Sequence, residues 1–473
     1  MHTYPAEPPM KGPPMRQRLL LAVSVLIACS AATIATVALA SPDERKKPHH
    51  KKGYEVWTVD QSDSRADGGG YLYVYDGPEL AKKPGSAEPE RIDLGGEARD
   101  MCLEQTGSAP QRPHMVVFNG GNSSVDGNAR AAIAFVASGH VLFMDADERK
   151  PIKCIDTGVQ AHAVWPTPDQ RQIIVANQND KKLGRISTDY DSDEYELEPA
   201  ATLDLANGTT PSGAPRQSPA LRPDNAPICP RTDDEGKRTF VTLRGGGMFV
   251  VDHRQTPMRI VAEYDKANVD ENGCGEIQAG DKMYVNSGAG ALATNPDNHD
   301  VYAFDVDDFG GRPNAPNVPA PKLVYSYDGR TGVDSHGVLL TKGERYLWTG
   351  DRQANTISVV DSRRDKLVNE FSIAQNSSSD PAPDLMDISP DGKTVFASLR
   401  GPFPQSGGHA SVGNTPGVGV IDVRRGGRDG RMKGVAKISN PTSSVESADP
   451  HAIRLRVLGG GPGRDDDERR HGR

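Results

Sequence analysis

The sequence predicts an all-β protein, a seven-bladed β-propeller of four-stranded antiparallel blades. Two observations predict this fold. An apolar strand that closes on an aspartate recurs along the chain, and the first copy of the repeat lacks a strand that the C-terminus can supply. The composition agrees, because 50 glycines and 37 prolines separate short runs rich in β-branched residues. The 473 residues could form one large core or about three ordinary ones, so length alone does not count domains.

The net charge excludes one class of partner. The formal net charge of −9 and the pI near 5.8 leave no general excess of basic residues to neutralise phosphate groups. We therefore expect no nucleic-acid partner, and contact with a membrane only if the chain is lipid-modified.

The N-terminus has the order of an export signal. Arg16 and Arg18 precede a long apolar run that ends in "ALA" before Ser41, the small-x-small form that signal peptidase accepts. The sequence predicts a signal peptide over residues 1–40 and a secreted or periplasmic protein. The alternative is a lipobox, "LIAC", which would leave Cys29 lipid-modified and the protein anchored outside the cytoplasm.

Polar segments flank the predicted domain. Residues 41–53, "SPDERKKPHHKKG", are typical of a solvated linker, and residues 458–473 have the glycine-rich, charged composition of a disordered tail. The propeller is predicted over residues 54–457.

The repeat marker is an apolar strand that ends in aspartate. Six clear copies and one degenerate copy are present, and the six intervals between the first and last copies average about 58 residues. That length suits a blade of four short strands with generous loops. The copies are "LYVYD" to Asp76, "VLFMD" to Asp145, "LGRIS" to Ser187, "MFVVD" to Asp252, "VYAFD" to Asp305, "ISVVD" to Asp361 and "VGVID" to Asp422.

The strands around the markers predict how the ring closes. Most markers follow two strands, which makes the marker the third strand of a four-stranded meander. The first marker follows only one strand, "YEVWTVD", whereas the chain ends in an unpartnered strand, "DPHAIRLR". If this last strand completes the first blade, seven blades close and no open sheet edge is left to aggregate.

Several of these segments resemble a known family. "SPDGKTVFAS", "GVGVIDVRRG" and "ERYLWTGDRQANTISVVDSRRDKLVNEF" are similar to the repeats of the YVTN-repeat family of bacterial seven-bladed β-propellers. The resemblance spans most of residues 54–457. It implies the fold, but such propellers include lactonases, quinoprotein and copper-enzyme domains and binding scaffolds, so it does not imply a function.

Aligning the blades places a chemically distinctive residue near the start of each first strand. First strands line the axial channel, so these positions form a ring at one mouth of the channel. They are His114, His162, Cys229, Cys274, His336, Asp384 and His451. Imidazole, thiolate and carboxylate groups are ligands of Cu, Zn and Fe. The ring therefore predicts a transition-metal site, and hydrogen bonds between neighbouring blades are the alternative role.

Polar residues at the ends of second strands should reach the same face. Arginines that converge on a funnel bind carboxylate or phosphate through their planar fork, so this set predicts a site for a small anionic ligand. Braces between blades are the alternative. The residues are Asn177, Gln178, Arg244, Arg352 and Arg400.

The cysteines leave two interpretations open. Four remain after cleavage following Ala40, and an even number in an exported protein favours disulfides. Cys229 and Cys274 occupy matching places in adjacent blades and could form a disulfide or jointly hold a metal. Cys102 and Cys154 are expected at the ends of outer strands, where blades diverge, so a bridge between them is less expected.

Three classes of function fit these observations. The first is an exported propeller that binds a metal ion or small anion at the mouth of its channel. The second is a hydrolase resembling the lactonase propellers, with His162 or His336 as the general base. The third is a monomeric interaction scaffold that binds a protein partner through long loops, such as residues 187–225 and 401–417.

Overall fold

The computed structural model describes residues 53–120, 129–289, 297–309, 319–327, 329–407, 411–442 and 445–458. The predicted signal peptide, the lipobox at Cys29, most of the polar linker and the C-terminal tail beyond Leu458 lie outside these residues.

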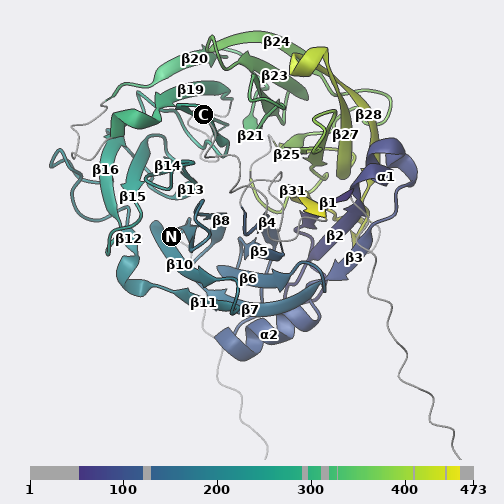
Figure 1. Cartoon of the computed structure of the whole chain (residues 1–473), viewed down its shortest axis with the longest axis horizontal. Helices are drawn as coiled ribbons and strands as arrows, with labels where there is room; N and C mark the ends of the chain where they lie inside the picture. The colour runs from purple at the N-terminus through teal and green to yellow at the C-terminus, as the bar shows by residue number, and fades with distance from the viewer. Residues whose placement is uncertain are drawn as a thin grey trace, which may run out of the picture. The chain divides into compact units, whose positions relative to one another are not determined.

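Seven four-stranded antiparallel blades form a ring, as the sequence predicts (Figure 1). The strands, from axis to rim, are β31 (Pro450–Leu458), β1 (Gly53–Asp60), β2 (Tyr71–Asp76) and β3 (Glu90–Asp93) in the first blade; β4 (Pro113–Phe118), β5 (Arg130–Phe135), β6 (His140–Asp145) and β7 (Lys150–Asp156) in the second; β8 (Ala161–Pro166), β9 (Gln172–Asn177), β10 (Lys182–Asp189) and β11 (Glu194–Leu197) in the third; and β13 (Pro227–Thr232), β14 (Thr239–Leu243), β15 (Met248–Asp252) and β16 (Arg259–Tyr264) in the fourth. The fifth blade has β17 (Glu276–Ala279), β18 (Lys282–Ser287), β19 (Asp300–Asp305) and β20 (Lys322–Ser326). The sixth has β21 (Ser335–Leu340), β22 (Tyr346–Asp351), β23 (Thr356–Asp361) and β24 (Lys366–Ser372). The seventh has β25 (Pro383–Ile388), β26 (Thr394–Leu399), β27 (Gly417–Arg424) and β28 (Asp429–Lys437).

Short elements decorate these blades. Two strands form a small separate hairpin, one adds to the third blade beside β10, and short 3₁₀ segments lie in connections of the described chain. They are β29 (Pro441–Thr442) with β30 (Val445–Glu446), β12 (Leu203–Asp204), η1 (Pro84–Ser86), η2 (Pro199–Ala201), η3 (Val306–Phe309) and η5 (Arg425–Gly427).

The C-terminal strand closes the ring by pairing with the first strand. β31 runs antiparallel to β1, with Val56 opposite Leu455, and the Thr58 hydroxyl donates a hydrogen bond to the Ala452 carbonyl oxygen at 2.8 Å. Ile453 and Leu455 are fully buried in the core that joins this blade to its neighbours. The predicted displaced strand is therefore confirmed.

Every repeat marker forms the third strand of its blade, and the structure explains the final aspartate. The Asp145 carboxylate accepts hydrogen bonds from the backbone N–H groups of Asp147 and Glu148, both at 2.8 Å. Asp361 and Asp305 make equivalent bonds to the second residue after them. An aspartate that bonds to the backbone two residues on stabilises the turn that leaves the strand.

Among the described residues, two α-helices accompany the strands. α1 (Gly77–Lys82) begins where the Asp76 carboxylate accepts a hydrogen bond from the Glu79 backbone N–H, and α2 (Glu97–Thr106) follows β3. Within the described ranges, neither helix is long and apolar enough to cross a membrane.

A disulfide joins α2 to the second blade. Cys102 of α2 is bonded to Cys154 of β7, with the two Cα atoms 5.1 Å apart. This bridge was the less expected of the two, and it forms because Cys102 lies on a helix packed against β7 rather than at the end of a diverging outer strand.

Ring closure gives the first testable prediction. A chain that ends at Asp449 lacks β31, so β1 keeps β2 but loses the strand on its axial side, and the core loses Ile453 and Leu455. We expect this variant to show no cooperative thermal unfolding by circular dichroism, whereas a chain that ends at Leu458 should unfold at the wild-type temperature. A wild-type transition in the shorter chain would contradict the closure role of β31.

Candidate functional site

Irregular strand pairing turns the ring residues toward the axis. In six of the seven inner strands, pairing with the second strand is broken where the ring residue lies, and such bulges re-aim side chains. The breaks fall between Pro113 and Met115, Ala161 and Ala163, Pro227 and Pro230, Ser335 and Val338, Pro383 and Met386, and opposite Thr58 to Asp60 in β31.

The four histidines come together at the axis, as their positions predict. The ring centroids of His114 and His451 lie 3.5 Å apart in a stacked arrangement. His162 lies 4.6 Å from His114, and His336 lies 5.4 Å from His451. Each ring centroid lies within 5.4 Å of at least one other, so the four imidazoles form one contiguous cluster.

Three of these imidazoles have a fixed tautomer. His162 Nδ1 donates to the Ile228 carbonyl oxygen and His451 Nδ1 donates to the His114 carbonyl oxygen, both at 2.8 Å. A carbonyl oxygen can only accept, so Nδ1 carries the proton in both rings and Nε2 keeps a free lone pair.

His114 has the same arrangement through Gln61. The distance from His114 Nδ1 to Gln61 Oε1 is 2.9 Å, and Gln61 Nε2 donates to Asp449, which fixes the orientation of the amide. His114 Nε2 is buried and has no hydrogen-bond partner among the described residues. The lone pair of this nitrogen is thus available inside the cluster.

Burial keeps the four imidazoles neutral. Loss of solvation lowers the pKa of His162 to about 4 and holds the pKa values of His114 and His451 well below the usual value, with additional repulsion from neighbouring histidines. Burial, followed by the nearby Arg352, also lowers the pKa of His336. Neutral imidazole is the form that can bind a metal or accept a proton.

Asp384 supplies a carboxylate to the same cluster. Its oxygens lie 2.5 Å from His336 Nδ1 and 3.7 Å from His451 Nε2, and one ligand atom from each of these three residues lies within 4.8 Å of the others. The cationic and imidazole neighbours hold the pKa of Asp384 well below its usual value although burial opposes this, so the group is ionised. The close approach needs Gly337, because a Cβ there would lie 2.2 Å from the Asp384 carbonyl oxygen.

The three predicted anion-binding arginines are all held by aspartates. Arg400 is fully buried and bonds to Asp384 and Asp449 at 2.6 to 2.8 Å. Arg352 Nε donates to Asp334 and Arg244 Nε donates to Asp224, each at 2.6 Å. Asp449 precedes β31 of the first blade, so Arg400 joins two blades, whereas the bonds from Arg352 to Asp334 and from Arg244 to Asp224 lie within one blade.

The predicted amide ligands also have structural partners. The side chain of Asn177 is buried, accepts from the Thr157 hydroxyl at 3.0 Å and donates to the Thr157 carbonyl oxygen at 2.6 Å. Gln178 is partly buried, and its backbone N–H donates to the Gln160 carbonyl oxygen. Both residues therefore bond to the turn that precedes β8, through the Asn177 side chain and the Gln178 backbone.

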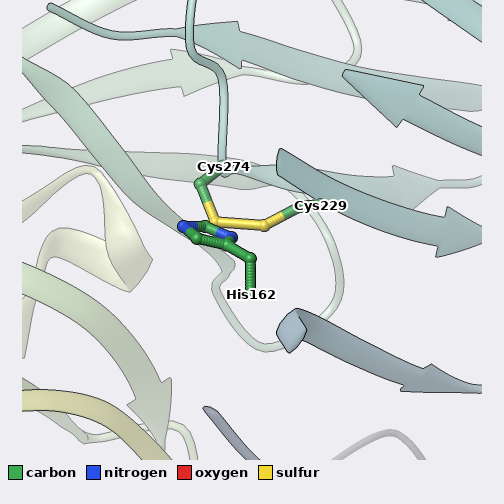
Figure 2. Close-up of side chains that lie close together, drawn as sticks. All are labelled: His162, Cys229 and Cys274. Atoms are coloured by element: carbon green, nitrogen blue, oxygen red, sulfur yellow. A yellow bond between two sulfur atoms is a disulfide. The ribbon is translucent and has the colours of Figure 1, made fainter. Parts of the chain in front are cut away.

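Cys229 and Cys274 form a disulfide beside His162 (Figure 2). The sulfur atoms and a nitrogen of His162 lie within 4.8 Å of one another. Because both sulfurs are bonded in this structure, the alternative in which the two thiolates hold a metal does not apply to it.

A segment of one long loop covers this mouth of the channel. In residues 401–407, the Gln405 backbone N–H donates to Asp449, and the Ser406 carbonyl oxygen accepts from Arg400. The Ser406 hydroxyl lies 3.3 Å from His114 Nδ1. This part of a loop that the sequence suggested for partner binding is therefore engaged within the protein.

A second group of axial residues was missed by the sequence analysis. A cavity of about 380 Å³ in the channel is lined by Trp165, Arg231, Glu276 and Arg454 among others. The available signal was position, because each lies two or three residues beyond a ring residue on an inner strand. An offset of two returns to the same face of a regular strand, whereas the offset of three at Trp165 and Arg454 follows a break in strand pairing.

The comparisons with known proteins support the fold. A periplasmic gluconolactonase of Pseudomonas aeruginosa matches with a TM-score of 0.53 and 13% identity over 86% of this chain and 100% of that chain. A protein of Bacteroides uniformis named as a 6-phosphogluconolactonase matches with a TM-score of 0.53 and 14% identity, over 85% and 99% of the two chains. A Lactobacillus plantarum protein has the same TM-score at 12% identity, again over 85% and 99%.

These likenesses establish the propeller architecture and no chemistry, because identity is low and propellers host many functions. No protein-family model and no curated protein matches the chain. Membership of the YVTN-repeat family therefore stays a prediction.

The buried histidines make stability depend on pH. The unfolded chain takes up a proton on His162 below about pH 6.5, whereas the folded protein does so only near pH 4, where the pKa of this residue lies. The stabilisation that depends on neutral His162 is therefore complete above pH 6.5 and is lost as the pH falls to 4.

We expect the free energy of unfolding, measured in urea from pH 7 to pH 4, to fall less steeply in His162→Gln than in wild type. The difference between the two proteins should shrink toward pH 4. Parallel curves would show that His162 is not held neutral by burial.

Proposed function

We propose that the protein binds a transition-metal ion at the mouth of its axial channel, through His336, His451 and Asp384, with His114 and His162 beside them. The observation that carries this proposal is the set of free imidazole lone pairs directed into one buried cluster next to an ionised carboxylate.

The surroundings of the imidazoles suit metal ligation. Histidines that bind metals usually donate the second ring N–H to a carbonyl or carboxylate oxygen, which orients the ring and raises its basicity. His162 and His451 donate in this way to backbone carbonyls, and His114 does so to Gln61.

The local charge also tolerates a cation. Asp334, Asp384 and Asp449 contribute three negative charges, against two positive charges from Arg352 and Arg400. The remaining negative charge and the neutral imidazoles favour a divalent ion, and two histidines with one carboxylate suit Zn, Fe or Cu.

We also propose that the protein works outside the cytoplasm. The predicted export signal supports this location, as do the two disulfides, Cys102–Cys154 and Cys229–Cys274, which persist in oxidising compartments.

Metal binding is tested by replacing the cluster. Metal-free wild-type protein should bind about one equivalent of Co²⁺ or Zn²⁺, with a visible absorption band for Co²⁺, whereas His336→Gln/His451→Gln should lose stoichiometric binding. Asp384→Asn should weaken affinity by about 10-fold to 100-fold.

The matched control is His299→Gln. His299 is a fully buried histidine that lies 2.9 Å from an aspartate, Asp351, but it is not one of the ring residues. Unchanged metal stoichiometry in a folded His336→Gln/His451→Gln protein would refute the site and leave these histidines as hydrogen-bonded braces.

Lactone hydrolysis is the second candidate function. The fold-level likeness to proteins named as gluconolactonases supports it, as does the neutral state of His162, whose Nε2 could take a proton from an attacking water. His336 is the other candidate base.

In a pH-stat assay with glucono-δ-lactone, a hydrolase of this kind should exceed the spontaneous rate. The excess should fall about 100-fold or more in His162→Gln or His336→Gln. Rates equal to the spontaneous reaction in wild type would remove this candidate for that substrate class.

A further inference from the structure

A second site is indicated by the cavity within the axial channel. The cavity has a volume of about 380 Å³ and includes the Cys229–Cys274 disulfide in its lining. Among the described residues, none of the four ring histidines lines it. The cavity is therefore separate from the proposed metal ligands, and a ligand bound in the cavity would not depend on them.

Two arginines meet over one aromatic ring in this cavity. The guanidinium carbon of Arg231 lies 4.3 Å from the Trp165 ring centroid, and that of Arg454 lies 4.7 Å from it. Burial lowers the pKa of Arg231 to about 10, and the nearby Arg454 adds to this shift. Asp234 favours the charged form of Arg231, and Asp387 favours that of Arg454. An anion that contacted both guanidiniums would stabilise these charges further.

Arg454 is one of the residues that line the cavity. Its Nε is buried and has no hydrogen-bond partner among the described residues. Asp387 is close enough to favour the charged form of Arg454, but its two oxygens accept backbone N–H groups of Ile388 and Leu455 at 2.8 and 2.9 Å. The Nε of Arg454 is thus available to a ligand.

The remaining lining includes three acidic residues, Asp234, Asp387 and Glu344, and one lysine, Lys342, beside a buried carboxyl and an apolar wall. Burial raises the pKa of Glu276 well above its usual value, which favours the neutral form of this carboxyl, and a neutral carboxyl can donate a hydrogen bond to an anion. Met115, Val338 and Leu385 provide apolar wall. A site with a few convergent polar groups on an apolar wall is typical of small-molecule pockets.

We propose that this axial cavity binds a small organic carboxylate, whose charged group pairs with Arg454 and Arg231 and whose carbon skeleton packs against Val338 and Leu385. Inorganic phosphate could pair with the arginines but would leave the apolar wall without a contact. The proposal therefore commits to a carboxylate attached to an apolar or planar body.

Tryptophan fluorescence offers a direct readout. The chain has three tryptophans, of which Trp57 and Trp348 are fully buried and Trp165 lines the cavity. Binding of benzoate should change the emission of wild-type protein and should also be measurable by calorimetry. In Trp165→Phe the change in emission should vanish while calorimetric binding remains.

The recognition of charge is tested with matched ligands and variants. Benzoate should bind at least tenfold more tightly than the neutral benzamide and than inorganic phosphate, and Arg454→Gln should weaken benzoate binding at least tenfold. Arg425→Gln is the control, because the Arg425 side chain is 78% exposed and lies outside the cavity lining. Arg454→Lys keeps the charge but not the fork, so it should fold and bind benzoate with intermediate affinity.

Several results would overturn the proposal. The first is that folded wild-type protein does not bind benzoate at millimolar ligand concentration. The second is that benzamide or phosphate binds as tightly as benzoate. The third is that Arg454→Gln binds benzoate with wild-type affinity. His336→Gln/His451→Gln should bind benzoate with wild-type affinity. Loss of benzoate binding in that variant would show that the cavity is not an independent site, whereas loss of metal alone leaves this proposal standing.

Discussion

The pairing of β31 with β1 is the contact on which the rest of the structure depends. It joins the two ends of the described chain. It also places two residues at the mouth of the channel, because His451 lies on β31 and Asp449 directly precedes this strand. His451 then donates to the carbonyl oxygen of His114 in the next blade, and Asp449 holds Arg400. Closing the ring and assembling the axial cluster are therefore the same event.

Local irregularity, rather than regular strand geometry, aims the functional side chains. A regular strand alternates its side chains between two faces, so a residue at the start of an inner strand has no intrinsic reason to point along the axis. The break in pairing at His114, His162 and His336 removes that restriction. The cost is an interrupted hydrogen-bond ladder, which the Nδ1 bonds of the histidines to neighbouring blades partly replace.

The charged groups at the mouth of the axial channel differ from those that line the cavity. At the covered mouth, aspartates neutralise Arg352 and Arg400, and the imidazoles are neutral lone-pair donors. Within the cavity, Arg454 Nε has no hydrogen-bond partner among the described residues, and burial favours the neutral form of Glu276. A buried charge is costly unless it is paired, and the two proposals accordingly assign a cation to the mouth and an anion to the cavity.

The sequence alone determined the architecture, because a repeat of about 58 residues and a displaced last strand depend only on the order of apolar runs and turns. It also identified His114, His162, His336 and His451 as one ring, since blades that repeat in sequence repeat in space. The roles of Arg244, Arg352 and Arg400 could not be predicted, because their aspartate partners, Asp224, Asp334, Asp384 and Asp449, come from neighbouring turns and blades.

Tertiary structure also decided the state of the cysteines and the existence of the cavity. Cys102 reaches Cys154 only because a helix that the repeat pattern does not contain packs against β7. Trp165, Arg231 and Arg454 come from three different blades, and no spacing within one strand relates them. The sequence determines which residues repeat from blade to blade. Which side chains of different blades come into contact is decided by ring closure and by bulges in the inner strands, and a local sequence pattern does not encode these long-range contacts.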